Sequence, residues 1–150
     1  MSIDVSTNRG AVLSDPAYQA FLLLRTAFTV APVLFGLDKF TNLLTYWPHY
    51  FSPAFARLVP LSASAFMHTV GIVEMVVGIL VLTRAVRVGA YVAMVWLICI
   101  AINLVSMHLY DIAVRDLAMA VGAFALARLE EVRAGVPARA RVARTAAATT

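Results

Sequence analysis

Long runs of hydrophobic residues alternate with short polar segments along this chain. A helix needs about 20 mostly apolar residues to cross the hydrocarbon core of a membrane. Four runs are of this kind, at residues 18–37, 63–82, 88–107 and 112–129, and the last is shorter and rich in alanine. The pattern predicts an all-α protein in which residues 1–133 form a bundle of four transmembrane helices.

The segments between the runs predict how the helices connect. Asp15 followed by Pro16 is typical of a helix start, with the aspartate as cap and the proline in the first turn. The connections around residues 83–87 and 108–111 are short, which predicts tight turns. Residues 38–62 form the one long connection. Its TNLLTYW stretch has apolar residues at helical spacing, and we expect an interfacial loop or short helix there.

Basic residues near the ends of the runs predict an orientation, because cytoplasmic loops of membrane proteins are enriched in Lys and Arg. If the N-terminus is cytoplasmic, the outer side holds only Lys39 and Arg57, with Arg115 just inside the fourth run. The cytoplasmic side then holds Arg9, Arg84, Arg87, Arg128, Arg133, Arg139, Arg141 and Arg144. We therefore expect both termini in the cytoplasm of a bacterium, and a disordered basic tail over residues 134–150.

Composition supports the bilayer as partner, since 62% of the residues are hydrophobic and only 13% are charged. The formal charge of +4 does not indicate nucleic-acid binding, because the arginines lie at the ends of apolar runs rather than in a basic stripe. The single cysteine, Cys99, excludes an internal disulfide and a Cys-x-x-Cys redox pair.

Ionisable and amide side chains within or beside the runs are the candidate functional groups, because such groups are costly in lipid and need a partner. These residues are Arg25, Asp38, Lys39, Glu74, Asn103, Asp111, Arg115 and Asp116. Measured from the outer end of each run, Arg25 lies roughly 20 Å deep and Glu74 roughly 16 Å deep. We therefore expect an Arg25–Glu74 pair inside the bundle.

A second group of charges lies nearer the outer ends of the runs. Arg115 is four residues from Asp111 and also at the depth of Asp38, so either carboxylate is a candidate partner. Asp116 is a candidate partner of Lys39. Two interpretations stay open: a salt-bridge network that fixes the packing of the helices, and a polar pocket that binds a small ligand or a quinone head group.

The histidines do not predict a metal site. His49, His68 and His108 all belong to the outer side, but no two of them have the spacing of a metal-binding motif. No nucleophile elbow and no glycine-rich phosphate loop is present.

Four stretches within residues 21–129 form a recognisable set: LFGLDKFTNLLTYWPHYFSP, GIVEMVVGILV, VGAYVAMVWLICIAINLVSM and YDIAVRDLAMAVGAFALARL. Together they resemble the DoxX/DoxD-like family of small four-helix integral membrane proteins. Arg25, Lys39, Glu74, Arg115 and Asp116 match positions where the family keeps charge. The resemblance implies a membrane subunit of a redox assembly, linked to quinone or to thiol and thiosulfate chemistry, in the cytoplasmic membrane.

Three hypotheses about function follow. The first is a small, accessory subunit that meets quinone and partners another membrane or peripheral redox protein. The second is a structural or interaction protein without catalytic activity. The third is a small-solute carrier, which the absence of a broken-helix repeat disfavours unless the protein forms a homo-oligomer. No cofactor other than quinone is indicated.

Overall fold

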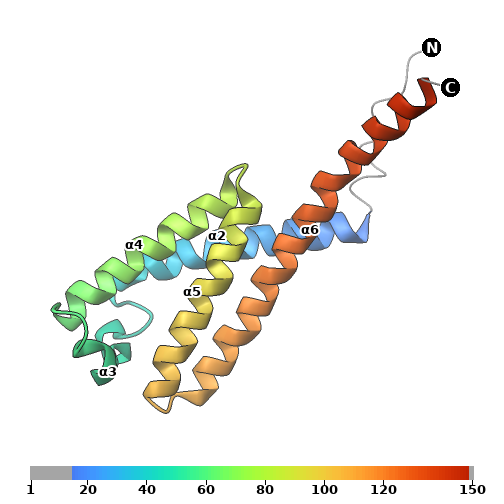
Figure 1. The fold of residues 1–150 in the computed structure, drawn as a ribbon. Helices are drawn as coiled ribbons and strands as arrows, with labels where there is room; N and C mark the ends of the chain where they lie inside the picture. The colour runs from blue at the N-terminus through green and yellow to red at the C-terminus, as the bar shows by residue number, and fades with distance from the viewer. Residues whose placement is uncertain (1–14, 149–150) are drawn as a thin grey trace.

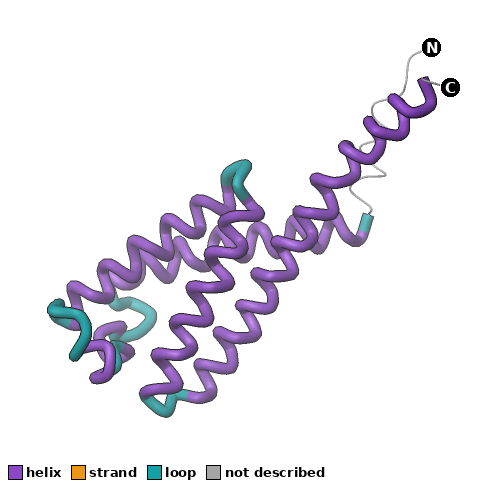
Figure 2. The backbone as a smooth tube through the Cα atoms, viewed as in Figure 1, coloured by secondary structure: helices purple, strands orange, loops and turns teal. Residues whose placement is uncertain are grey.

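The computed structural model describes the chain from residue 15 to residue 148, and side chains as far as residue 135. All regular structure in this part is helical (Figures 1 and 2). The elements are α2 (Pro16–Thr41), the 3₁₀ helix η1 (Trp47–Tyr50), α3 (Pro53–Ala56), α4 (Ala63–Leu82), α5 (Val86–Ser106) and α6 (Tyr110–Ala148).

Three of these helices, α2, α4 and α5, are long and apolar enough to cross a membrane. The expected all-α fold is therefore confirmed in the described part of the chain, with three of the four predicted spans among the helices able to cross a membrane. The bounds of α4 are the predicted ones, and α5 begins two residues before the predicted start.

The first helix begins where the sequence predicts and ends later. The Asp15 side chain accepts a hydrogen bond from the backbone of Ala17, and Pro16 occupies the first turn. The helix continues to Thr41, and Asn42 ends it in the left-handed conformation at a φ of 53°. The predicted end at residue 37 is thus four residues short, which matters for the depth of every charge on this helix.

Helices α2 and α4 pack closely because glycines face each other along their contact. A Cβ atom added at Gly36 would lie 2.5 Å from the carbonyl oxygen of Gly71, and one added at Gly71 would lie 2.6 Å from that of Gly36. Further along, Gly78 lies against the backbone of Thr29. These contacts allow the backbones to touch, as small residues do between helices in lipid.

Helices α5 and α6 form the second closely packed pair, with alanines at the contact. Ala93 packs with Ala123 in one core cluster, and Ala101 packs with Ala113 in another. Helices α4 and α5 meet closely near the turn that joins them, where Gly89 lies against Val81. Away from that turn they diverge (Figure 1). The molecule thus consists of two helix pairs joined at one end.

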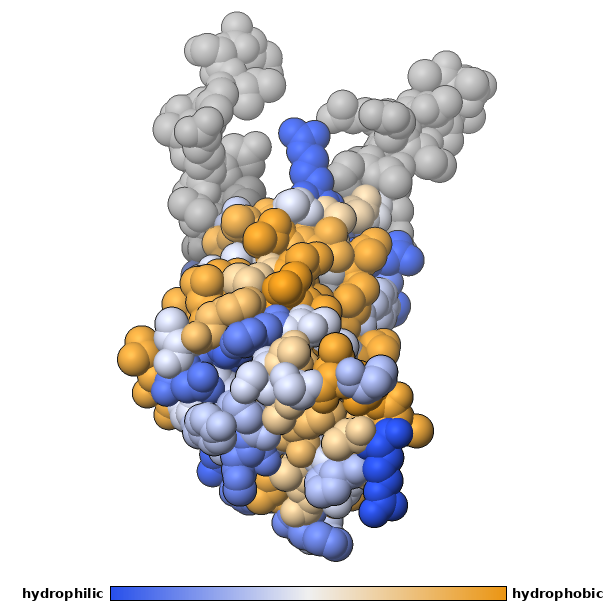
Figure 3. All heavy atoms as spheres, turned by 90° about the vertical axis from the view of Figure 1, so that its left-hand side faces the viewer, coloured by the Kyte–Doolittle hydropathy of each residue, from blue (hydrophilic) through white to orange (hydrophobic). Residues whose placement is uncertain are grey.

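The long connection between α2 and α4 lies at the opposite end, across the ends of α4 and α5. Phe51 stacks on Phe66 of α4 with ring centroids 4.3 Å apart, and the Tyr50 carbonyl accepts a hydrogen bond of 2.9 Å from Asn103 of α5. The expected short helix is present as η1 and α3, but TNLLTYW is not helical except for its last residue, Trp47. Hydrophilic residues interrupt the hydrophobic surface at this end (Figure 3).

The last helix differs from the expectation at its C-terminal end. The predicted helix stops near residue 133 and is followed by a disordered tail, whereas α6 runs on to Ala148. Alanine and arginine, which dominate this segment, are among the strongest helix formers, and their propensity accounts for the extension. Residues 149 and 150 lie outside the described part of the chain.

Candidate functional site

A buried ion pair joins the first two long helices. The Lys39 ammonium lies 2.6 Å from Oε2 of Glu74, and the two residues are only 4% and 8% exposed. Lys39 reaches this position because its Cβ lies beside Gly71, one turn from Glu74, where the missing side chain leaves room. A buried pair of this kind is stable only while both members are present, because a single buried charge is strongly unfavourable.

Trp47 covers this ion pair near the C-terminal end of α2. The Lys39 nitrogen lies 3.7 Å from the centre of the Trp47 ring, a cation–π contact. The same indole donates a hydrogen bond of 2.6 Å from Nε1 to Oδ2 of Asp38. One tryptophan thus connects the adjacent charges Asp38 and Lys39 and fixes the start of η1 over them.

Asp38 organises the end of α2 rather than pairing across the bundle. Its carboxylate accepts hydrogen bonds from the backbone N–H groups of Leu43 and Leu44 and from the hydroxyl of Thr41. With the bond from Trp47, these donors satisfy it locally. The expectation that Asp38 pairs with Arg115 is wrong, because local donors already occupy the carboxylate.

A second buried carboxylate accompanies the Lys39–Glu74 pair. Asp116 of α6 is 8% exposed and has no hydrogen bond or ion pair among the described residues. It lies within electrostatic range of Lys39 and Glu74, but Lys39 forms its ion pair with Glu74 and not with Asp116, the partner that the sequence suggested. One ammonium therefore faces two buried carboxylates contributed by two different helices.

Arg25 does not pair with Glu74, so that expectation is wrong. Its guanidinium donates to the carbonyl oxygens of Val81, Leu82 and Thr83, at 3.2, 2.7 and 3.0 Å. These carbonyls belong to the last turn of α4, where a helix leaves acceptors without partners and where its dipole favours a cation. Because α2 extends to Thr41, Arg25 lies one turn deeper than the predicted helix end implied, at the far end of α4.

The remaining candidates lie apart from this cluster. Asp111 and Arg115 are exposed on α6, and no ion pair joins them among the described residues. Asn103 contacts the connection between α2 and α4 through its amide nitrogen, which donates to the Tyr50 carbonyl, while its buried Oδ1 has no hydrogen-bond partner among the described residues. The structure thus unites Lys39, Glu74 and Asp116, and separates Arg25, Asp111 and Arg115 from them.

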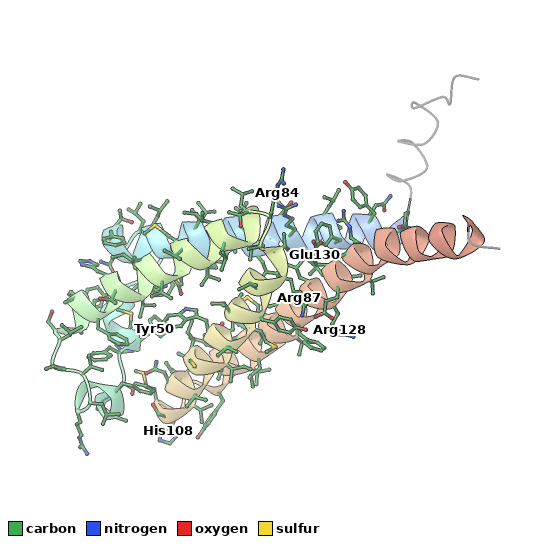
Figure 4. The ribbon with its side chains drawn as sticks, turned by 45° about the horizontal axis from the view of Figure 1, so that its top comes forward. Tyr50, Arg84, Arg87, His108, Arg128 and Glu130 are labelled. Atoms are coloured by element: carbon green, nitrogen blue, oxygen red, sulfur yellow. The ribbon has the colours of Figure 1, made fainter. Side chains whose placement is uncertain are left out.

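The sequence did not single out a polar contact at the opposite end of the molecule. Glu131 of α6 accepts a hydrogen bond of 3.0 Å from Tyr91 of α5 and forms ion pairs with Arg87 and Arg128. Arg84, Arg87, Arg128 and Glu130 lie toward this end, whereas Tyr50 and His108 lie toward the other (Figure 4). Arg87 and Tyr91 are four residues apart and therefore lie on the same side of α5. This spacing was the feature of the sequence that could have predicted a shared partner.

The three histidines do not converge. His68 stacks on Phe40, His49 packs edge-on against Tyr50, and His108 lies beside Tyr110. No group of three metal-ligating side chains occurs in the described part of the chain. Each ring is instead engaged by a separate aromatic neighbour.

Comparisons with known proteins assign this chain to no family. The chain matches no family model, no curated protein and no solved structure. The buried charges and the helices able to cross a membrane are therefore the features that bear on function.

Proposed function

We propose that this chain is a DoxX-like integral membrane protein that serves as a small, accessory subunit of a redox assembly linked to quinone or to thiol and thiosulfate chemistry. Its setting is the bacterial cytoplasmic membrane, with α6 as the fourth span and both termini in the cytoplasm. The arginines grouped beside the α4–α5 turn and on α6 support this orientation.

One observation carries the proposal: a second buried carboxylate, Asp116 of α6, lies within electrostatic range of the buried Lys39–Glu74 ion pair that joins α2 and α4. A carboxylate without a counter-ion is costly in a low-dielectric interior, and it can take up a proton to lose its charge. A site that handles protons or polar groups of a lipid-soluble redox carrier has a use for the extra carboxylate. Such intramembrane groups commonly mark ligand and proton pathways.

The test is a comparison of quinone-linked respiration in membranes that carry the wild-type chain or a Glu74→Gln variant. We expect the variant to insert and fold, since Asp116 still faces Lys39, but to lose most of the activity that depends on the chain. Asp111→Asn, which removes an exposed carboxylate on α6, is the matched control and should behave as wild type. Unchanged activity in the folded Glu74 variant would overturn the proposal.

A structural or interaction role is the second candidate, and two contacts favour it. Arg25 satisfies the end of α4, and Trp47 closes the Lys39–Glu74 pair. Both contacts hold helices in register without needing a ligand. If this role is the whole function, variants of Lys39, Glu74 and Asp116 lose cellular activity only to the extent that they lose stability. In addition, no protein with redox cofactors co-purifies with the chain.

The orientation has its own test. With Cys99 replaced by alanine, a cysteine at Arg57 should react with a membrane-impermeant maleimide from outside intact spheroplasts. A cysteine at Arg84 should react only after the membrane is opened. The reverse pattern would contradict the proposed topology.

A further inference from the structure

Asp116 on α6 carries a buried carboxyl group that receives no hydrogen bond. The residue is 8% exposed, and among the described residues it has neither a hydrogen-bond donor nor an ion-pair partner. The other buried carboxylates in this part of the chain differ, because Asp38 accepts from four donors and Glu74 accepts from Lys39. A carboxylate that loses water without gaining donors is strongly unfavourable, and such a group becomes neutral by binding a proton.

The charged groups around Asp116 do not supply the missing partner. Lys39 of α2 and Glu74 of α4 lie within electrostatic range of it. The ammonium is in contact with Glu74, at 2.6 Å, and forms no ion pair with Asp116. The nearest charged residues on α6 itself, Asp111 and Arg115, are exposed and do not pair with it. The cluster therefore holds two carboxyl groups and one cation, and the cation is already paired.

The helix that packs along α6 adds no charge beside Asp116. Arg87 is the only charged residue of α5, and it pairs with Glu131 at the opposite end of the molecule. Tyr91 donates to the same glutamate, and Cys99 is exposed. Asp116 thus lacks a counter-ion of its own on every helix that surrounds it.

The Asp116 oxygens are nevertheless open to proton exchange. The fold completely encloses the unpaired Nε1 of Trp96 and Oδ1 of Asn103, but it does not enclose the oxygens of Asp116 in the same way. A proton needs far less room than a molecular ligand. The carboxyl group can therefore gain or lose a proton while most of the side chain stays out of water.

We propose that Asp116 is a proton-binding residue, which holds one proton at neutral pH while Lys39 and Glu74 remain a charged pair. Binding forms one O–H bond on the carboxylate, and release returns the proton to water. Carboxyl groups within membrane helices commonly serve as proton relays. This inference rests on the proposed function and names the group that handles protons there, since a quinone takes up protons when it is reduced.

The experiment is infrared difference spectroscopy of the full chain at a series of pH values. The C=O stretch of a neutral carboxylic acid is separate from the bands of ionised carboxylates and of the backbone, so it reports the bound proton directly. Maltoside micelles are used because they contribute no carbonyl band. We expect the wild-type chain to show the neutral-acid band at neutral pH and to lose it in alkaline solution.

A matched pair of variants assigns the band. Asp116→Asn should remove it. Asp111→Asn removes an exposed carboxylate from the same helix and should keep it.

The balance of charge predicts opposite changes in two further variants. Glu74→Gln releases Lys39 to become the counter-ion of Asp116, so the band should disappear at neutral pH. Lys39→Met leaves both carboxyl groups without a cation, so the band should become about twice as strong. A side chain that only fills space would not produce these opposite changes.

Circular dichroism reports whether each variant folds. If Asp116→Asn or Lys39→Met does not fold, Glu74→Gln decides. Three results would overturn the inference: no neutral-acid band in the wild-type chain at neutral pH, persistence of the band in folded Asp116→Asn, or an unchanged band in folded Glu74→Gln.

The two proposals can fail separately. If Glu74→Gln abolishes quinone-linked activity but the wild-type chain shows no neutral acid, the redox function stands and the proton-binding role of Asp116 is wrong. If Asp116 holds the proton but quinone-linked activity does not depend on the chain, the proton-binding residue stands and the redox function is wrong.

Discussion

Lys39 and Glu74 form a buried ion pair across the α2–α4 contact, with 2.6 Å between the ammonium and the carboxylate. The pair is unusual because a second carboxylate, that of Asp116 on α6, lies near it. Lys39 is therefore the common partner, and the two members of the pair are not equivalent.

This asymmetry predicts different costs for removing each member. Lys39→Met leaves two buried carboxylates without a cation and should destabilise the protein by about 3–5 kcal/mol. Glu74→Gln leaves Lys39 facing Asp116 and should cost less. Equilibrium unfolding in mixed micelles measures both values. Equal losses for the two variants would show that Asp116 does not contribute to the balance of charge.

Arg25 and Glu74 should behave independently in a double-mutant cycle. Arg25→Ala removes the donors to the last carbonyls of α4 and should cost about 1–3 kcal/mol. Because the guanidinium does not contact Glu74, the combined Arg25→Ala and Glu74→Ala losses should add within about 0.5 kcal/mol. The same cycle on Lys39 and Glu74 should show strong coupling, which makes it the positive control.

The α2–α4 contact should not tolerate a methyl group at its closest point. Gly36→Ala and Gly71→Ala place a Cβ against a backbone carbonyl, and each should separate the helices and lower stability by about 1–3 kcal/mol. Gly135→Ala is the matched control. It meets nothing within 4 Å, and it should be neutral or stabilising by about 1 kcal/mol because alanine favours a helix.

Trp47 has two separable contacts, and graded substitutions should distinguish them. Trp47→Phe keeps an aromatic ring near Lys39 but loses the hydrogen bond to Asp38, which should cost about 1.5–3 kcal/mol. Trp47→Leu loses the cation–π contact as well and should cost a further 0.5–2 kcal/mol, on the order of such contacts elsewhere. A leucine variant as stable as the phenylalanine variant would contradict the role of the ring.

The sequence predicted the helices better than it predicted their charge partners. Apolar runs of the length of a membrane, and the Asp15–Pro16 start, predict the start of α2, both ends of α4, and α5 to within two residues. The extension of α2 to Thr41 was not visible, because the helix continues through the polar residues Asp38 and Lys39 once the fold buries them.

That extension also explains why the Arg25–Glu74 pair was predicted wrongly. A helix end misplaced by four residues shifts the estimated depth of a residue by about 6 Å. That shift is enough for Arg25 to be predicted beside Glu74 in place of Lys39, the partner that the structure shows. The partners of Asp38 were missed for a different reason. They are backbone N–H groups and the Trp47 indole, and the positions of such donors depend on the path of the loop rather than on residue type.

The placement of the Lys39–Glu74 pair within one helix pair has a consequence for biosynthesis. Both charges belong to α2 and α4, which are synthesised before α5 and α6, and glycines bring these helices together without help from α5 or α6. The first hairpin therefore enters the bilayer with these two charges mutually neutralised. Asp116 arrives last, so the unbalanced carboxylate joins a scaffold that is already assembled around its cation.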